Sequence, residues 1–264
     1  MKRNSFAWVK YTLVFSLFIF AGCHKIDWDD VWHKHNPNCQ VKKLTYYRES
    51  DPIAVNAVFS YNSHGQPTKV VYDYIATGRP NIVFKYDHSG RLTDYIAPYD
   101  NNNYEVWFKY EYDGSGRIVS DTQFVFGQYI DSVPLPSTYL AAPGFYEYDI
   151  WGRVTQETRH YPMSNVQVWQ YEYNSAGNLS AIKSFFNGVP AGTENITTYD
   201  TKVSVLRTNP VWMFLERNYS KNNKIAATSY NSKGLPTHFN SPGLHYRFVH
   251  ETDISHSVIE YKCK

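Results

Sequence analysis

The stretch that decides the fold is residues 148–155, which read Tyr-Asp-Ile-Trp-Gly-Arg-Val-Thr. An Asp at the end of a strand can open a turn, because its side chain bonds back to the backbone two residues further on. A Gly in the left-handed region closes a longer hairpin loop with a bulge. The apolar residue after the turn then starts a return strand. The stretch therefore predicts a strand, a tight turn and a second strand.

The same pattern recurs along the chain as Tyr, Asp or Asn, two variable residues and Gly. The six copies begin at Tyr61, Tyr86, Tyr112, Tyr148, Tyr173 and Tyr230, and their turn residues are Gly65, Gly90, Gly116, Gly152, Gly177 and Gly234. A seventh copy begins at Tyr219 and has Asn223 in the Gly position. Asn is the next-best residue at positive φ. We therefore expect a left-handed backbone conformation at Asn223, as we do at Gly90, Gly116, Gly152, Gly177 and Gly234.

A two-residue alternation of aromatic and polar side chains precedes most of the turns, as in residues 84–86 (Phe-Lys-Tyr) and 146–148 (Tyr-Glu-Tyr). This period places the aromatic side chains on one face of a strand and the polar ones on the other. Successive copies are mostly about 25 residues apart, which suits two strands per unit. No stretch shows convincing helical periodicity. We therefore predict an all-β fold, a single domain built as an antiparallel meander of tandem hairpins.

Two segments interrupt the repeat. Pro134, Pro136 and Pro143 fall between the third and fourth copies, so we interpret Ser132 to Gly144 as an inserted loop, because Pro cannot join a central strand. Residues 208–215 form a dense apolar block. That block is either an exposed patch that marks an interaction site or a buried plug over the concave face of the sheet. The plug is favoured, since something must cover one face of a sheet.

The N-terminal residues indicate export. Lys2, Arg3 and Lys10 accompany an apolar run over residues 11–20, which ends at Ala-Gly-Cys in residues 21–23. This pattern is typical of a bacterial signal peptide, and the run is shorter than the roughly 20 residues of a membrane-spanning helix. Ala-Gly-Cys resembles a lipobox, the motif at which cleavage exposes a cysteine for lipidation. The alternative is ordinary signal cleavage with an incidental cysteine.

These observations divide the chain into three parts. We expect a lipoprotein signal peptide over residues 1–22, a flexible tether over 23–40 and the β domain over 41–264. Acyl chains on Cys23 would anchor the protein to a membrane, because each buried methylene contributes about 0.8 kcal/mol. We therefore expect an outer-membrane lipoprotein, either on the cell surface or facing the periplasm. Acidic residues at 27, 29 and 30 resemble the export tags of surface lipoproteins and favour the surface.

The repeat itself carries a resemblance. Tyr-Asp-x-x-Gly-Arg-Leu/Val-Thr, at residues 86–93 and 148–155, resembles the YD repeat of the Rhs and teneurin families. Together with the lipobox it is similar to a family of uncharacterised Gram-negative lipoproteins. The resemblance covers roughly residues 41–239 and implies a spiralling antiparallel sheet and surface association, but no catalytic residues. Gln66, Asn178 and Leu235 replace the Arg, and the repeats are too few for the hollow shell of Rhs proteins.

The net charge of the mature chain limits the classes of partner that we expect. Removing the signal peptide takes away three of the 26 Lys and Arg and none of the 24 Asp and Glu, so the mature net charge is near −1. We expect no nucleic-acid partner, because proteins that bind nucleic acids carry a basic surface.

The cysteines predict a disulfide. Once Cys23 is lipidated, Cys39 and Cys263 remain. In an oxidising compartment they either pair or stay free, and we expect a disulfide that staples the two ends of the domain.

No residue pattern predicts catalysis. Glu111, Glu147 and Glu172 occupy the same place in successive repeats, so we interpret them as a cross-strand ladder and not as a catalytic pair, which needs two different environments. His33 and His35 lie in the tether, and no phosphate, nucleotide or hydrolase motif appears. We expect no metal and no cofactor.

The leading function is a structural or binding module that presents its aromatic surface to a glycan or protein ligand. The alternative is a hydrolase that acts on an extracellular glycan polymer, and a third hypothesis is a remnant of a toxin-delivery shell. The binding module requires tyrosines on an exposed face. The hydrolase requires an asymmetric cluster of acids in one cleft.

Overall fold

The computed structural model describes residues 37–48, 53–137, 141–225, 227–249 and 251–264. In chain order the strands are β1 (Cys39–Arg48), β2 (Val55–Tyr61), β3 (Pro67–Tyr72), β4 (Ile82–Tyr86), β5 (Leu92–Pro98), β6 (Asn103–Tyr112), β7 (Ile118–Ile130), β8 (Val133–Leu135), β9 (Ala141–Tyr148), β10 (Val154–Tyr161), β11 (Asn165–Tyr173), β12 (Leu179–Phe186), β13 (Val189–Asn195), β14 (Ser229–Tyr230), β15 (Pro236–Tyr246) and β16 (Glu251–Cys263). The helices are η1 (Val205–Thr208), α2 (Pro210–Glu216) and η2 (Arg247–Val249), of which the first and last are 3-10 helices.

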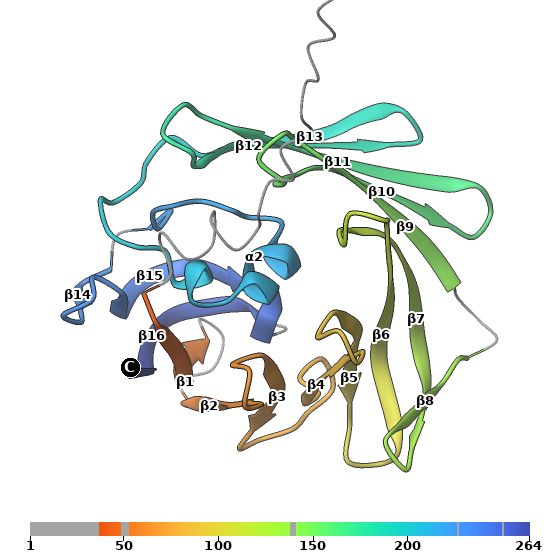
Figure 1. Cartoon of the computed structure of the whole chain (residues 1–264), viewed down its shortest axis with the longest axis horizontal. Coiled ribbons are helices and arrows are strands. Elements are labelled where there is room, and N and C mark those ends of the chain that lie inside the picture. Colours follow the sequence, from red (N-terminus) through yellow and green to blue (C-terminus); the bar gives the residue numbers. More distant parts are fainter. Residues whose placement is uncertain (1–36, 49–52, 138–140, 226, 250) are drawn as a thin grey trace, which may run out of the picture.

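Within these ranges all sixteen strands belong to one sheet, in the order β13-β12-β11-β10-β9-β7-β6-β5-β4-β3-β2-β1-β16-β15-β14, with β8 paired to β7. Strands that follow one another in the chain are therefore neighbours in space almost everywhere. The sheet bends into an arc that does not close, with β13 and β14 at its two edges (Figure 1). The predicted all-β antiparallel meander is confirmed.

The six motif turns share one set of hydrogen bonds. In the copy that begins at Tyr86, the backbone N–H of Asp87 donates to the carbonyl of Arg91 (2.9 Å) and that of Gly90 donates to the carbonyl of Asp87 (3.0 Å). The Asp87 carboxylate accepts from the backbone N–H groups of Ser89 and Arg91, each at 2.9 Å. This is the turn-opening role that the short side chains of Asp and Asn perform.

The motif glycines have the left-handed backbone that closes such a loop. Their φ values are +80° (Gly65), +77° (Gly90), +78° (Gly116), +70° (Gly152), +83° (Gly177) and +76° (Gly234).

Four of the six motif tyrosines, together with Tyr199 and Tyr261 outside the motif copies, tie their strand or turn to an earlier strand. Each hydroxyl donates to a backbone carbonyl near the start of an earlier strand. The pairs are Tyr61 with Val41, Tyr86 with Pro67, Tyr112 with Leu92, Tyr148 with Ile118, Tyr199 with Leu179 and Tyr261 with Pro236, at 2.6–2.9 Å. All six side chains are half-buried. The repeat therefore uses its tyrosines for internal contacts, and they do not form the exposed aromatic face that the binding hypothesis required.

A further Tyr-Asp pair, at residues 199–200, opens a turn that an insertion splits. The N–H of Asp200 donates to the carbonyl of Asn223 (3.0 Å), and the N–H of Asn223 donates to the Asp200 carboxylate (3.0 Å). These are the bonds that Asp87 makes with Arg91 in an ordinary turn. Asn223 thus takes the place of the motif Arg, although 23 residues separate it from Asp200.

The prediction of a positive φ at Asn223 is therefore wrong, because Asn223 is not one of the described residues whose φ is positive. The spacing from Tyr219 imitates the motif, but the Asp that uses this turn lies far upstream in the chain. Asn223 is buried, and its side-chain amide donates to the Asp200 carboxylate (2.9 Å) and to the carbonyl of Val203 (3.2 Å).

Residues 201–222, hereafter the insert, fold into η1 and α2 and lie inside the curve of the sheet (Figure 1). The side chain of Asn209 caps α2 by accepting from the N–H of Val211 (3.0 Å). Trp212 is fully buried, and its ring meets Phe59 and Phe84 edge-on. The apolar block is thus a buried plug. The expectation of no helix is wrong here, because a helix of seven residues is too short to show periodicity.

The prediction of an inserted loop from Ser132 to Gly144 is also wrong, because the segment contains β8 and the start of β9. Pro134 lies in β8, which among the described strands pairs with β7 alone. Pro143 lies in β9 opposite Thr122, and the ladder from β9 to β10 ends beside it at Gly144. Each proline therefore occupies a position with a ladder on one side only, which is where a strand tolerates the missing N–H.

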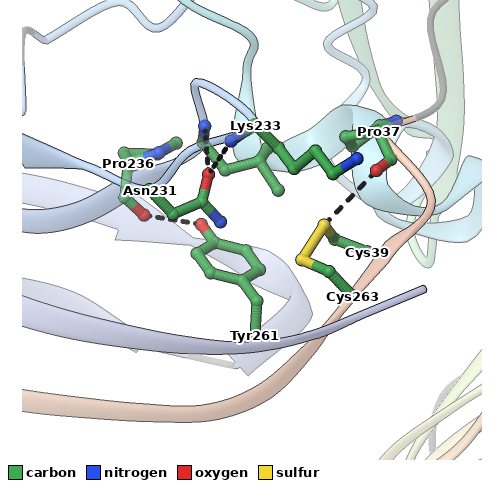
Figure 2. Close-up of a disulfide and its surroundings, with 8 residues drawn as sticks. Pro37, Cys39, Asn231, Lys233, Pro236, Tyr261 and Cys263 are labelled. Carbon is green, nitrogen blue, oxygen red and sulfur yellow. Dashed lines mark hydrogen bonds between the residues drawn. A yellow bond between two sulfur atoms is a disulfide. The ribbon is translucent and has the colours of Figure 1, made fainter.

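The first and last strands are neighbours, and a disulfide joins them. Cys39 and Cys263 face each other in the ladder between β1 and β16, with their Cα atoms 4.0 Å apart, although 224 residues separate them in sequence. Figure 2 shows the disulfide near Tyr261, whose hydroxyl donates to the carbonyl of Pro236 (2.7 Å). The disulfide thus joins the first and the last strand of the chain.

The predicted boundary between tether and domain differs slightly from the structure. The strand β1 begins at Cys39, so the expected start of the domain at residue 41 lies inside that strand. The expected signal peptide, the lipidation site Cys23 and the residues His33 and His35 lie outside the described residues.

Candidate functional site on the concave face

A cavity of about 960 Å³ lies between the concave face of the sheet and the insert. Strands β5, β6, β7, β10, β11 and β12 contribute most of one wall, and the insert with the residues around it contributes the other. Sites for small molecules are typically concave, largely apolar and about 300–1,000 Å³ in volume. The cavity is therefore the strongest candidate for a functional site in the part of the chain that the structure describes.

Four buried charged side chains form a closed network at the cavity wall. Arg159 donates two hydrogen bonds to the carboxylate of Asp121 (2.8 and 2.9 Å) and one to Glu157 (2.8 Å). The second oxygen of Glu157 accepts from Arg217 (3.0 Å). All four residues are at most 5% exposed. A buried charge is tolerated when it is paired and hydrogen-bonded, and here each carboxylate oxygen has a guanidinium partner.

The backbone of β9 makes room for Arg159. A Cβ atom at Gly144 would lie 2.6 Å from a guanidinium nitrogen of Arg159, closer than real Cβ atoms approach. Gly144 pairs with Arg159 across the ladder, so the absence of a side chain there leaves room for the guanidinium beside the strand. Gly144 is needed for this close approach and not for its backbone angles.

Arg217 connects the insert to the network. It follows α2 in the left-handed conformation (φ 51°, ψ 30°), which ends the helix and turns the side chain toward the sheet. Its guanidinium donates to Glu157 and to the hydroxyl of Tyr146 (2.6 Å). Its backbone carbonyl accepts from the hydroxyl of Tyr173 (3.3 Å), a motif tyrosine that bonds to a later segment and not to an earlier strand. Charge-assisted bonds thus fix the insert against the cavity wall.

Two glutamates of the cavity wall have pKa values shifted in opposite directions. Burial alone would raise the pKa of Glu157, but Arg217 and Arg159 outweigh burial and lower this pKa to about 2. Glu216 is half-buried, and burial raises its pKa to about 7 even though the N–H of Phe248 donates to its carboxyl group (2.9 Å). Glu157 is therefore ionised at physiological pH, and Glu216 titrates close to neutrality.

Two buried hydroxyls lie near the cavity without a hydrogen-bond partner of normal geometry. They belong to Tyr95 and Tyr171, and Arg247 lies near Tyr171. Both side chains are less than 5% exposed, and their hydroxyl oxygens have almost no accessible surface, so a molecule in the cavity would not contact these oxygens. Trp169, which also lines the cavity, is half-buried and offers more of its ring.

Among the described residues that the sequence predicted as site residues, Asn223 lines this cavity and the others lie away from it. Cys39 and Cys263 are brought together, and the motif glycines lie at hairpin turns that do not line it. Glu111 accepts from Ser120 (2.8 Å), Glu147 accepts from Gln156 (2.6 Å) and Glu172 pairs with Lys183. These three glutamates make cross-strand contacts, but only Glu172 has a basic partner among them.

Sequence reasoning missed the buried network, although one signal was present. Glu157 and Arg159 are two residues apart, so their side chains lie on the same face of β10, and both are buried. Charged residues at inward-facing positions of a strand are unusual and indicate a paired network. The partners Asp121 and Arg217 come from segments 38 and 60 residues away, which no local pattern reveals.

Two further properties of the site follow from the described residues. Within them, no group of three or more His, Cys, Asp or Glu side chains is arranged to hold a metal ion. The helices of the described ranges are also too short or too polar for any of them to cross a membrane.

Comparisons with known proteins add little beyond the fold. No family model and no curated protein matches the chain. Solved structures with a similar backbone include a TcdB2-TccC3-Cdc42 structure (14% identity, TM-score 0.31), TcdB2-TccC3 without its hypervariable C-terminal region (14%, 0.32) and the Tc holotoxin pore of Photorhabdus luminescens (16%, 0.31). The alignments cover 74%, 75% and 69% of this chain but only 11%, 11% and 9% of those chains. Similarity at this level carries no argument about function.

Proposed function

We propose that this chain is a membrane-anchored lipoprotein whose curved β-repeat sheet binds a small ligand in its concave cavity. The observation that supports binding most directly is the cavity itself, a concave space of about 960 Å³ whose lining includes the apolar and aromatic side chains of Phe108, Trp169 and Ile182. This volume and lining are typical of sites for small molecules. The ligand site is thus inside the curve, and not on an outer aromatic surface.

The anchor in this proposal rests on the N-terminal sequence. A charged start, a short apolar run and Ala-Gly-Cys at residues 21–23 support lipidation of Cys23 and attachment to the outer membrane, on the cell surface or facing the periplasm. The regular turn geometry and the Tyr-Asp-x-x-Gly motif also support a common repeat plan with YD-repeat proteins. The near-neutral charge supports a partner other than nucleic acid.

Membrane fractionation tests the anchor. The full chain expressed in a Gram-negative host should partition with membranes, and mass spectrometry should find acyl groups on Cys23. The Cys23→Ala variant should instead be released into the soluble fraction. Full retention of the variant in membranes would rule out lipidation as the anchor.

A thermal-unfolding screen tests the cavity. A compound that binds only the folded state raises the unfolding temperature. We expect at least one class among saccharides, peptides and acyl compounds to stabilise the wild type but not Ile182→Trp, which would fill the space beside Tyr171. The matched control is Val71→Trp, because Val71 is 43% exposed and does not line the cavity. Equal shifts in both variants, or no shift with any class, would contradict the proposal.

One observation favours the hydrolase alternative. Glu157 and Glu216 line the same cavity with pKa values moved apart, which is the property of an acid and base pair. Against it, both oxygens of Glu157 are held by arginines, so this carboxylate is committed to structure. Incubation with neutral polysaccharides should release no reducing ends. Release that disappears in Glu216→Gln would establish the hydrolase instead.

A further inference from the structure

We propose that the cavity takes an amphipathic monocarboxylate, whose carboxylate pairs with Arg247 and whose apolar body lies along the cavity wall. This inference rests on the proposed function, because it names the chemical class that the cavity binds. Three observations carry it: the free charge of Arg247, its position beside Tyr171, and the accessible apolar side chains around that position.

The free charge of Arg247 points to an anionic ligand. Within the described residues, Arg247 forms no ion pair, although it is exposed and lines the cavity. The other three bases of the lining form ion pairs with carboxylates, namely Arg159, Arg217 and Lys224. A guanidinium binds a carboxylate through two parallel, charge-assisted hydrogen bonds. One free guanidinium therefore matches a ligand with one negative charge.

The acids of the lining leave this charge available. Three of the four acids are already bonded to basic or hydroxyl side chains. The fourth, Glu216, accepts from the backbone N–H of Phe248 (2.9 Å), and burial raises its pKa to about 7. Glu216 is therefore mostly protonated at pH 6, where a ligand carboxyl with an ordinary pKa of about 4 is ionised. At this pH the ligand carboxylate, and not Glu216, carries the negative charge that Arg247 lacks.

The position of Arg247 determines which part of the wall the ligand reaches. Arg247 lies near Tyr171 of β11. Ile182 of β12 faces Tyr171 across the ladder, and Trp169 is two residues away on the same face of β11. All four residues line the cavity. Because two residues of a strand span only about 7 Å, a carboxylate at Arg247 places the rest of the ligand beside Ile182 and Trp169.

The side chains around this position favour an apolar body. Phe108, Trp169 and Ile182 are half-buried and line the cavity, so each keeps apolar surface that a ligand can cover. Tyr161 also lines the cavity and is 38% exposed, and no hydrogen bond engages its hydroxyl within the described part of the chain. This hydroxyl lies near Arg247 and can donate to the same carboxylate. The site thus combines one polar end with an apolar wall.

Calorimetric titration of the full chain at pH 6 tests this inference with matched probes. Octanoate and 4-phenylbutyrate carry the carboxylate, whereas octanamide and 4-phenylbutanamide have nearly the same shape without the charge. We expect at least one carboxylate to bind about tenfold more tightly than its amide, or better. Arg247→Gln should weaken binding of that carboxylate by about 10- to 150-fold, the loss of a hydrogen bond to a charged group, and leave amide binding unchanged. Tyr161→Phe should weaken carboxylate binding by about 2- to 13-fold.

Two variants serve as controls. Lys109→Gln removes one positive charge from β6 and should leave every affinity unchanged, because Lys109 is exposed and does not line the cavity. Arg247→Lys should retain part of the carboxylate binding, because it keeps the charge and loses the planar fork. An equal loss in Lys109→Gln and Arg247→Gln would overturn the role of Arg247.

The remaining outcomes separate this inference from the broader proposal. Tighter binding of octyl phosphate would overturn the carboxylate head, and tighter binding of glucuronate would overturn the apolar body. If the amides bind as tightly as the acids and Ile182→Trp abolishes both, the monocarboxylate assignment fails while the cavity remains a ligand site. Failure of all six probes to bind would also overturn the assignment.

Discussion

Single residues hold this fold at positions where the backbone is left-handed or unusually crowded. Gly116 is the cleanest example of the first kind, since its φ is +78° and nothing lies within 4 Å of a Cβ built on it. Any cost of a side chain there comes from backbone conformation alone, because no neighbour has to move.

We therefore predict that Gly116→Val lowers the free energy of unfolding by about 1–2 kcal/mol and that Gly116→Asn costs less. Chemical denaturation of the purified variants measures both. The matched control is Ser115→Val in the same turn, because Ser115 has no positive φ. A neutral Gly116→Val would contradict the role given to the motif glycines.

Crowding at Gly144 gives the second prediction at this scale. Gly144→Ala places a Cβ 2.6 Å from the Arg159 guanidinium and should displace it from Asp121, leaving a buried carboxylate unpaired. Breaking a buried pair costs about 3–5 kcal/mol, so denaturation should show a loss of that size. Gly114→Ala is the control, as nothing lies within 4 Å of its Cβ and its φ is not positive. Similar losses in the two variants would refute the explanation.

Residue-level prediction from sequence succeeds where the chemistry is local. The turn at Gly90 can be read from four neighbouring residues, because Asp87 bonds to groups at most four positions away. Asn223 could not be read in this way, since its partner Asp200 lies 23 residues upstream. The nearby Tyr219 offered a local match that the backbone does not use.

The same limit applies to the prediction of strands and helices from the sequence. Aromatic alternation identifies strands such as β4 and β9, but it gives no sign of α2, which is seven residues long and stable only because the curved sheet surrounds it. The buried face of α2 includes Trp212 and Met213, and its last residue is Glu216 at the cavity wall.

The raised pKa of Glu216 predicts how the stability of this element depends on pH. The pKa of Glu216 in the folded protein is about 7, so the carboxyl group keeps its proton up to about that pH, whereas the ordinary pKa of a glutamate is 4.5. Between these values the folded state binds more protons than the unfolded chain, so stability falls as pH rises through the window and stays lower above it.

We predict that Glu216→Gln matches the wild type near pH 4.5 and is more stable by about 1–3 kcal/mol at pH 8. Urea denaturation at a series of pH values measures the difference. Glu172→Gln is the control, because Glu172 is an exposed partner of Lys183. Parallel pH profiles for the wild type and Glu216→Gln would contradict the burial of this carboxyl group.

At the scale of the whole molecule, the disulfide links β1 and β16, the first and last strands of the chain, which are neighbours in the sheet. Removing a native disulfide typically costs about 2–5 kcal/mol. We predict a loss in this range for Cys39→Ser/Cys263→Ser, measured by denaturation of the exported protein. Peptide mapping without reductant should recover residues 39 and 263 in one linked fragment. Two free thiols in exported protein, or an unchanged stability, would contradict the pairing.

The arrangement of the cavity could not be predicted from the sequence, for a physical reason. Its wall brings together Arg159 of β10, Asp121 of β7 and Arg217 after α2, and the curvature of the complete sheet determines where these segments meet. A repeat predicts the sheet but not the radius of its arc or the path of the insert. The cavity depends on both.

The most direct test of the central claim is a crystal structure of the full chain grown with the compound that raises its unfolding temperature most. The account predicts ligand density inside the curve of the sheet, in contact with Trp169 and Ile182 at the cavity wall. Density only on the outer face of the sheet, with no ligand in the cavity, would contradict it.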